Sequence, residues 1–434
     1  MLHSELGRFC TFLALLTFAG CACPHKETSS QPAPAAKVFD IRKFGARGDG
    51  KTLDTKALQA AFDACGEAGG GTVTIPPGTY LSQPLFMRNK TTLQIDKRAT
   101  LLATDNRDDF LNPAKTNGPV TSGSFLAFIN GKDLSDISIT GKGAIDGAGA
   151  KWWVPAEEAR RKVPGYTLPR PKMVVLTGCK RVRVTDVTLQ NAPCFNLVPW
   201  DCEDVLIDGI TILAPSNSPN TDGIDPSVSR NVTITHCRID VGDDNVAIKS
   251  GARMPGREFA CENITVTDCV FLHGHGMSIG SDTSGGVRNV RVERCTFQDT
   301  ENGIRIKSPR GRGGRVENLY YGDITMKNVD PAITITCYYP KIPAQDEAQP
   351  VTDQTPSFRD ITIKNVVATS PKSAGVIVGL PESLITNVLL ENVQISSTTG
   401  LTVRNAKAVK LKHVRVNPKK GEALLTDNAL LEHL

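Results

Sequence analysis

The stretch NVTITHCRI, residues Asn231–Ile239, alternates apolar with polar side chains and is rich in β-branched residues. Such alternation is typical of two short strands joined by a turn, each with one face against a core. The same frame recurs along the chain, with copies that begin at Arg181, Asp204, Asn231, Asn263, Asn289, Asn318, Asp360, Asn387 and Ala408. Strand units repeated at such short intervals stack as the coils of a solenoid. We therefore predict an all-β fold, a single-stranded right-handed parallel β-helix.

The seventh position of the frame is apolar in every copy. It holds, in chain order, Val187, Ile210, Cys237, Cys269, Cys295, Ile324, Val366, Val393 and Val414. This pattern predicts an interior ladder in which cysteine behaves as a small apolar residue. The chain has no C-x-x-C pair, so we expect no metal site. A disulfide among the twelve cysteines stays open.

The first coil of a β-helix would expose unpaired backbone groups, so its end needs a cover. The segment TLDTKALQAAFDACGEAGGG, from Thr52, carries Leu58, Ala61, Phe62 and Cys65 on one helical face. It stops at three successive glycines. We predict an N-terminal capping helix here.

An apolar run, FCTFLALLTFAGC, covers Phe9–Cys21 and is too short to span a bilayer comfortably. It ends in small residues before a cysteine, which favours a bacterial lipoprotein signal with lipidation of Cys21. The alternative is an ordinary secretory signal. We expect residues 1–21 to be this signal peptide.

Residues 22–36 are rich in Pro, Ser and Ala and are typical of a flexible tether. Residues 37–434 then form the β-helix, which we expect to be the catalytic domain. We expect an exported protein, located at the bacterial cell envelope or secreted, whose membrane contact is limited to the possible lipid anchor.

The charge of the chain excludes one broad class of partner. Fifty basic residues are interleaved with 45 acidic ones, for a formal net charge of +5. This balance argues against a dedicated nucleic-acid binder. We expect a monomer.

Two adjacent carboxylates, Asp243 and Asp244, stand in VGDDNVAIKSG at the start of a predicted strand. Counted from the frame starts, Asp243 and His275 share the same offset, and equal offsets lie one strand spacing apart in stacked coils, roughly 4.8 Å. Aligning Ile248 with Ile279 instead moves this match by one residue. The residues predicted to cluster on one outer face are Asp222, Asp243, Asp244, His275, Arg305 and Lys307.

Four short motifs in this order resemble glycoside hydrolase family 28, the polygalacturonase-like pectinases. They are NTD at Asn220–Asp222, GDD at Gly242–Asp244, GHG at Gly274–Gly276 and RIK at Arg305–Lys307. The resemblance extends over nearly all of the chain after residue 37. It implies a pectin-lyase-like solenoid that hydrolyses α-1,4-galacturonosidic bonds of pectic polysaccharide with inversion, without a cofactor. One departure is Asn245, where many relatives carry cysteine.

The resemblance also implies catalytic roles. Asp243 is expected to be the general acid, while Asp222 and Asp244 hold and deprotonate the attacking water. We expect the two neighbouring carboxylates to raise the pKa of Asp243 and keep it protonated. His275 is expected to contact the acid and tune it.

The remaining matched residues concern the substrate. Arg305 and Lys307 alternate with Ile306 and face one way, which suits a sugar carboxylate. Tyr339 matches the family's substrate tyrosine if the preceding strand is aligned directly, whereas Tyr338 is one residue away. Asn220 is assigned to substrate binding with them. Arg310, Arg312 and Arg315 fit either a polyanionic substrate or a solvated loop.

Other polar and aromatic residues receive structural interpretations or stay open. Asp225, Asp240 and Lys249 are expected in turns or on the surface. Trp152 and Trp153 either stack on a sugar or pack their own insertion.

Three alternative functions remain. A rhamnogalacturonan or xylogalacturonan hydrolase would use the same chemistry. A pectate lyase would cleave the polymer by elimination with calcium, and a non-catalytic β-helix would only bind the polysaccharide or act as an adhesin.

Overall fold

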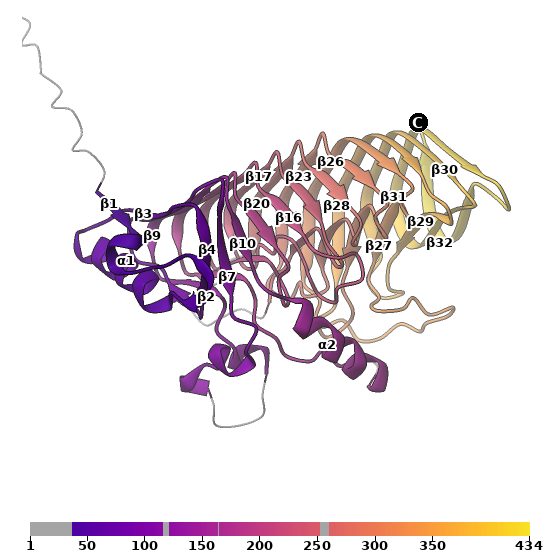
Figure 1. Cartoon of the computed structure of the whole chain (residues 1–434). Coiled ribbons are helices and arrows are strands. Elements are labelled where there is room, and N and C mark those ends of the chain that lie inside the picture. Colours follow the sequence, from indigo (N-terminus) through magenta and orange to yellow (C-terminus); the bar gives the residue numbers. More distant parts are fainter. Residues whose placement is uncertain (1–36, 116–120, 164, 252–259) are drawn as a thin grey trace, which may run out of the picture. The chain divides into compact units, whose positions relative to one another are not determined.

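The structure, a computed structural model, describes residues 37–115, 121–163, 165–251 and 260–434. The expected signal peptide, the tether and Cys21 lie outside these residues. Lys37–Leu434 form one compact unit, and its strands stack as successive coils (Figure 1). Every pair of strands is parallel, which confirms the predicted parallel β-helix.

The coils pair through three ladders that run along the stack. The first ladder contains β1 (Val38–Asp40), β3 (Gly71–Ile75), β6 (Thr91–Ile95), β9 (Ser135–Gly141), β12 (Lys180–Thr185), β15 (Glu203–Asp208), β17 (Arg230–Thr235), β20 (Cys261–Thr267) and β23 (Val287–Glu293). It continues through the long bent strands β26 (Arg315–Lys327), β28 (Ser357–Thr369), β30 (Ile385–Ser397), β31 (Thr399–Pro418) and β32 (Leu424–His433).

The second ladder contains β2 (Asp49–Leu53), β4 (Gly78–Ser82), β7 (Ala99–Ala103), β10 (Ala144–Asp146), β13 (Thr188–Gln190), β16 (Thr211–Leu213), β18 (Arg238–Asp240), β21 (Val270–Leu272) and β24 (Thr296–Gln298), which pairs with β26.

The third ladder contains β5 (Leu85–Phe86), β8 (Ile129–Lys132), β11 (Val174–Thr177), β14 (Leu197–Trp200), β19 (Val246–Ile248), β22 (Met277–Gly280), β25 (Ile304–Lys307), β27 (Ile333–Thr336) and β29 (Ser373–Val378). Single bridges at Ile224 and Ser227 join β14 to the coil of β19.

The frame begins at a turn residue in the left-handed conformation. Asn231 and Asn263 have φ of 55° and 57°, a conformation that asparagine tolerates better than most residues. Their side chains also bond along the stack, since Asn231 Nδ2 donates to Asp204 Oδ1 at 2.9 Å and Asn263 Nδ2 donates to Asn231 Oδ1 at 3.0 Å. This ladder explains why Asn and Asp open most copies of the frame.

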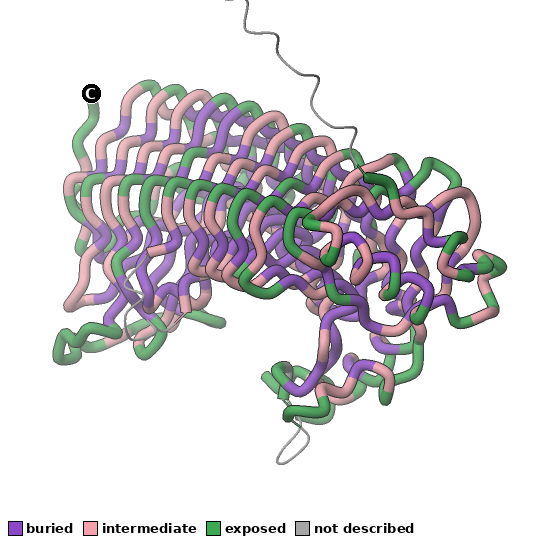
Figure 2. Tube along the Cα trace, turned by 90° about the vertical axis from the view of Figure 1, so that its left-hand side faces the viewer, coloured by how far each residue is buried: buried purple, intermediate pink, exposed green. Residues whose placement is uncertain are grey.

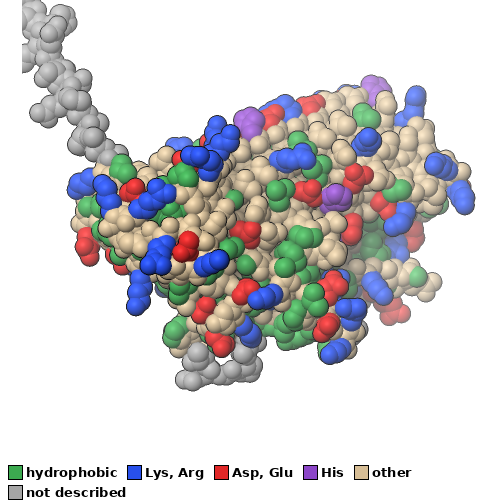
Figure 3. Space-filling view, viewed as in Figure 1, with side chains coloured by type: hydrophobic (Ala, Val, Ile, Leu, Met, Phe, Trp, Pro, Cys, Tyr) green, Lys and Arg blue, Asp and Glu red, His purple; other side chains and the backbone are tan. Residues whose placement is uncertain are grey.

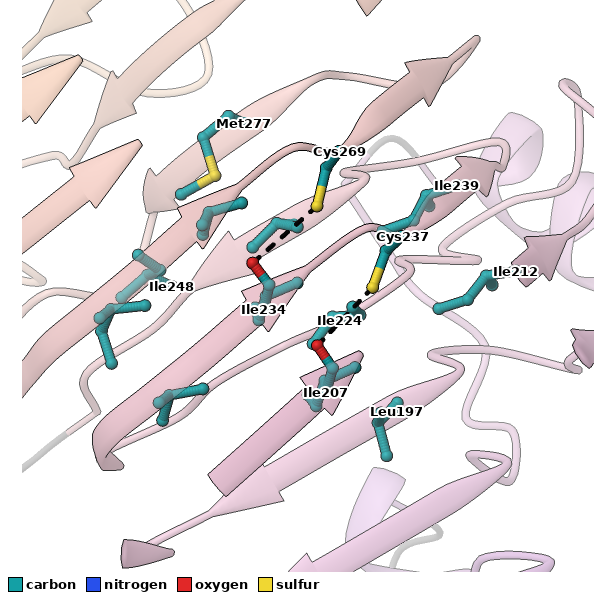
Figure 4. Packing of buried hydrophobic residues seen from close by; sticks show 14 of the residues in the cluster. Leu197, Ile207, Ile212, Ile224, Ile234, Cys237, Ile239, Ile248, Cys269 and Met277 are labelled. Atoms are coloured by element: carbon teal, nitrogen blue, oxygen red, sulfur yellow. Dashed lines mark hydrogen bonds between the residues drawn. The ribbon is translucent and has the colours of Figure 1, made fainter. Parts of the chain in front are cut away.

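The predicted cysteine ladder lies in the core. Cys237, Cys269 and Cys295 are buried, and each Sγ contacts a carbonyl oxygen of the preceding coil (Figure 4 draws the first two). The tube in Figure 2 shows the same pattern over the whole unit, with buried residues recurring in every coil. The nine described cysteines are free thiols.

The helix predicted near the N-terminus is present as α1 (Thr55–Glu67). Leu58, Ala61, Phe62 and Cys65 are buried, and α1 packs against β1, β3, β4, β5 and β6. It lies at the N-terminal end of the described coils (Figure 1).

A second helix, α2 (Ala150–Lys162), belongs to an insertion. Its Trp152 is buried and packs edge-on against Phe110 and Phe125, while Trp153 Nε1 donates to Ala192 O at 3.0 Å. Both tryptophans therefore pack the insertion. The short helical turns are η1 (Ile41–Phe44), η2 (Arg107–Phe110), η3 (Pro113–Lys115) and η4 (Ser122–Ser124).

In the part of the chain that the structure describes, no helix has the length and apolar character needed to cross a membrane. Basic and acidic side chains are intermixed on the face seen in Figure 3.

Candidate active site

The predicted cluster forms where the turns preceding the third ladder meet its outer face. Ile248 pairs with Ile279 in the ladder, so Asp244 comes into register with His275. This is the one-residue alternative to the match between Asp243 and His275. The turn also bonds along the stack, since His275 N donates to Asp243 O at 2.9 Å.

Gly274 allows this turn to lie close to the preceding coil. Its φ is 67°, and a Cβ at this position would be 2.3 Å from Asp243 O. A side chain would therefore push His275 away from Asp243, so the glycine of the GHG motif is required by the close approach of two coils.

Asp244 is held by residues from two later coils. Lys307 Nζ lies 3.0 Å from its Oδ2, and Arg305 Nη1 lies 3.1 Å from its Oδ1. Ser278 Oγ donates to Oδ1 at 2.7 Å. Burial alone would raise the pKa of Asp244, but Lys307 and Arg305 hold it well below its usual value. Asp244 is therefore ionised.

Asp243 pairs with His275, which also reaches Glu301. His275 Nδ1 lies 3.1 Å from Asp243 Oδ1, and its Nε2 lies 3.1 Å from Glu301 Oε2. Burial alone would lower the pKa of His275, but the contacts with Asp243 and Glu301 raise it to about 9. The imidazole is thus an imidazolium at neutral pH, with a carboxylate at each nitrogen.

This contact corrects the predicted pKa of Asp243. Burial and Asp244 do raise the pKa of Asp243, but His275 and Lys307 outweigh them and its pKa falls below the usual value. In the protein without substrate, the proton expected on Asp243 resides instead on its neighbour His275.

Asp222 lies in the preceding coil and contacts a different cation. Lys249 Nζ lies 2.8 Å from Asp222 Oδ2 and 2.7 Å from Asp225 Oδ2. Asp225 is buried and Lys249 is largely buried, so the prediction that both lie in turns or on the surface was wrong. Burial raises the pKa of Asp222 well above its usual value, and Lys249 opposes this shift.

Asp240 does lie at the surface, as predicted, where it pairs with His273 at 2.8 Å.

Asn220 connects Asp243 to a buried arginine. Asn220 Nδ2 donates to Asp243 Oδ2 at 3.4 Å, and its Oδ1 accepts a bond of 2.7 Å from Arg170 Nη2. Arg170 Nη1 donates to Pro193 O and Pro219 O, both at 2.8 Å. Arg170 therefore fixes the turn that carries Asn220.

The two candidate tyrosines are separated by the structure. Tyr339 is exposed, and Lys307 Nζ lies 5.3 Å from the centre of its ring. Tyr338 is buried, and its hydroxyl donates to Asp346 Oδ2 at 2.7 Å. Only Tyr339 therefore borders the cluster.

In the basic loop after Lys307, Arg310 and Arg312 have different surroundings. Arg310 pairs with Asp346 at 2.8 Å and with Glu382 at 2.6 Å. Arg312 is exposed, and its Nη1 donates to Ser281 Oγ at 3.3 Å.

Asn245, which follows the paired aspartates, is hydrogen-bonded through both ends of its side-chain amide. Its Nδ2 donates to Ile239 O at 3.0 Å, and its Oδ1 accepts from Gly276 N at 2.8 Å. An amide therefore bridges the neighbouring coils at this position.

Sequence reasoning did not identify Arg170, Ser278 and Glu301 as members of the site. Ser278 pairs with Arg305 in the ladder, so strand alternation around MSIG was a usable signal. Arg170 and Glu301 lie outside the helices and strands, and no periodic pattern marks them.

The assembled site can donate and accept protons and can bind an anion. The ligand atoms of Asp243, Asp244 and His275 lie within 4.8 Å of one another. That spacing would suit a metal ion, but the positive charge here comes from His275, Arg305 and Lys307. Paired carboxylates beside a row of cations are suited to hydrolysis of a glycosidic bond in an acidic polysaccharide.

A parallel β-helix with such a site on its outer face defines a polysaccharide-cleaving enzyme of the β-helical class. The chain belongs to glycosyl hydrolases family 28, whose family model matches residues 65–416. It is therefore a glycoside hydrolase.

Named relatives and a solved structure support this assignment. An endo-polygalacturonase of Pectobacterium carotovorum subsp. carotovorum is 34% identical over 369 residues, 82% of this chain and 87% of the relative. A probable polygalacturonase of Vitis vinifera is 34% identical over 379 residues, 84% of this chain and 74% of the relative. The solved polygalacturonase from Erwinia carotovora ssp. carotovora superposes with a TM-score of 0.72 at 32% identity, over 90% of this chain and 99% of that one.

Proposed function

We propose that the protein hydrolyses α-1,4-galacturonosidic bonds of pectic polysaccharide with inversion of the anomeric centre. The observation that carries the proposal is that Asp222 lies in the coil before Asp243 and Asp244, with Lys249 against Asp222, His275 against Asp243, and Arg305 and Lys307 against Asp244. The names of the relatives indicate pectic polysaccharide as the substrate, and the carboxylates provide the groups that hydrolysis requires.

Asp243 acts as the general acid and receives its proton from His275. In the free protein the two form an imidazolium–carboxylate pair at 3.1 Å. A bound sugar excludes water and brings its own negative charge, and both changes favour the neutral pair over the ionic one. The proton moves from His275 Nδ1 to Asp243 and then to the leaving glycosidic oxygen, while Glu301 stabilises the imidazolium beforehand.

Asp222 and Asp244 hold the attacking water and accept its proton. Asp244 is ionised and fixed by Ser278, Arg305 and Lys307. Asp222 has one buried oxygen, Oδ1, without a protein partner in the described residues. This is the oxygen that we assign to the attacking water.

Arg305 and Lys307 also bind the substrate carboxylate, with Tyr339 beside Lys307. In the free protein both cations contact Asp244, so the substrate carboxylate shares them with Asp244. Asn220 bonds to Asp243 and positions the acid at the same sugar. A rhamnogalacturonan or xylogalacturonan chain would present the same uronate and is the second candidate substrate.

We also propose that residues 1–21 direct export and that lipidation of Cys21 anchors the protein at the cell envelope. Residues 22–36 then act as the tether of a catalytic domain over 37–434. The apolar run before a cysteine and the extracellular location of a pectic polymer support this proposal.

Proton NMR of the first-formed product tests the mechanism. With polygalacturonate as substrate, we expect reducing ends in the β configuration, since inversion of an α bond gives the β anomer. A first product in the α configuration would contradict the water-activating role of Asp222 and Asp244. Release of an unsaturated product that absorbs in the ultraviolet would instead identify a lyase.

A further inference from the structure

Lys249 is the cation of the site that the mechanism above leaves without a role. It follows β19 directly, in register with Ser227 of the preceding coil. Its side chain reaches back to Asp222 and Asp225, at 2.8 Å and 2.7 Å, and its Nζ lies 4.2 Å from the centre of the Phe195 ring. One ammonium therefore bridges two carboxylates against an aromatic face.

The two carboxylates have little other support. Asp222 and Asp225 are 3% and 1% exposed, and the Oδ1 atom of each lacks a protein partner in the described residues. A buried carboxylate without a cation takes up a proton, because burial disfavours the charged form. A protonated Asp222 would be unable to accept the proton of the attacking water.

We propose that Lys249 is a positioning residue that favours the ionised form of Asp222 and aims its free oxygen at the water, while Asp225 competes for the same ammonium. This inference rests on the proposed function, because it assigns Lys249 to the reaction in which Asp222 is a base. Because Asp225 shares the ammonium of Lys249, it weakens the stabilisation that Lys249 gives to ionised Asp222. Asp225 therefore shifts the pH below which activity is lost.

The ionisable groups around this pair come from several coils. They are Arg170, Lys172, Cys194, Asp225, Asp243 and Asp244. Burial is the main cause that raises the pKa of Asp222; Lys249 lowers this pKa, and Asp225, Asp243 and Asp244 raise it further. Substitutions at Lys249 and Asp225 should therefore shift the pKa of Asp222 in opposite directions.

The experiment compares the pH dependence of kcat/KM on polygalacturonate for wild type, Lys249→Met, Lys249→Arg and Asp225→Asn. Losing a charged partner changes an equilibrium by about ten- to a hundredfold, or roughly one to two pKa units. In Lys249→Met, we expect the acidic limb to move up by that amount and activity to recover as pH rises. Lys249→Arg should return the limb toward wild type, and Asp225→Asn should move it to lower pH.

A purely structural role for Lys249 predicts a different pattern, since both substitutions break the same ion pair. Equal losses at all pH values in Lys249→Met and Asp225→Asn would therefore overturn the inference, as would an unshifted acidic limb in a folded Lys249→Met. If Lys249→Met fails to fold, Asp225→Asn still tests the inference. An acidic limb that is unchanged or moved to higher pH in Asp225→Asn would contradict competition between Asp225 and Asp222 for Lys249.

A stability cycle separates this inference from the proposed function. Thermal midpoints of Lys249→Met and Asp222→Asn, alone and combined, measure the pairing without any substrate. We expect Lys249→Met to be less damaging when Asp222 is already neutral. If the wild type releases no reducing ends from polygalacturonate but the two substitutions show this coupling, the proposed substrate is wrong and the ion pair stands. Additive effects of the two substitutions would instead contradict the ion pair.

Discussion

At the scale of single residues, the adjacent Asp243 and Asp244 differ in the cations that contact them. Asp244 contacts Arg305 and Lys307 from later coils, whereas Asp243 contacts the imidazolium of His275. Adjacent residues therefore have different proton affinities, as acid and base roles require. In the proposed mechanism, the proton that Asp243 donates is held on His275, at an ion-pair distance of 3.1 Å, when no substrate is bound.

Asp243→Asn should abolish turnover and leave folding and substrate binding nearly intact. The substitution removes a proton donor and keeps the shape of the side chain, so we expect a loss of about 10²- to 10⁴-fold in kcat. The measurement is release of reducing ends from polygalacturonate. Asp240→Asn, three residues earlier at the end of β18, is the matched control and should retain wild-type activity; a mutant within about tenfold of wild type would remove Asp243 from the acid role.

At the scale of elements, strand β25 determines the anion site. Its alternation buries Ile304 and Ile306 in the core and places Arg305 and Lys307 on the outer face. The ladder then sets Arg305 beside Ser278 and Lys307 beside Gly280. Gly280 has a φ of 98°, and a Cβ there would lie 2.0 Å from Lys307 O, so this glycine allows the two coils to approach each other at Lys307.

Lys307→Ala tests whether this strand recognises a uronate. We expect the variant to lose about ten- to a hundredfold in rate on de-esterified pectin and far less on highly methyl-esterified pectin, because esterification already removes the substrate charge. The exposed Arg312, on the loop after β25, provides the control Arg312→Ala, which should affect both substrates little. If Lys307 only balanced Asp244, the loss would be equal on both polymers and the pH optimum would shift.

At the scale of the whole molecule, stability should depend on the charge of His275, which joins carboxylates from the coils before and after it. The pKa of His275 is raised from 6.5 to about 9. A raised pKa contributes stability that is fully present below the unfolded value and is lost as pH rises through the folded value. We therefore expect the free energy of unfolding to fall between about pH 6.5 and 9, by on the order of 3 kcal/mol at most.

Denaturant titrations across this pH range measure the effect. In His275→Gln the decline should be absent, and the variant should be less stable than wild type at pH 6. His273→Gln is a suitable control, because His273 also pairs with a carboxylate, Asp240, on the neighbouring surface. An identical alkaline decline in wild type and His275→Gln would show that another group is responsible.

Local patterns in the amino-acid sequence were sufficient to predict the repeating coil of the β-helix. Apolar alternation and the recurring Asn or Asp at each turn are local properties, because a pleated strand and a left-handed turn each constrain the residues within them. The stacking of the motifs also followed from the sequence, although the match of Asp243 with His275 by equal offsets was one residue out of the register in the ladder. The positions of Asp222, Asp243, Asp244 and His275 could thus be predicted together.

The ion-pair partners of the charged side chains, in contrast, could be assigned only from the folded structure. Lys249 contacts residues 24 and 27 positions away, and Lys307 contacts one 63 positions away. The sequence predicted Lys249 and Asp225 in turns or on the surface and a proton on Asp243, and both predictions needed correction. The physical reason is that burial and the direction of long side chains set the energy of a charge. Both depend on the packing of several coils, which no local pattern specifies.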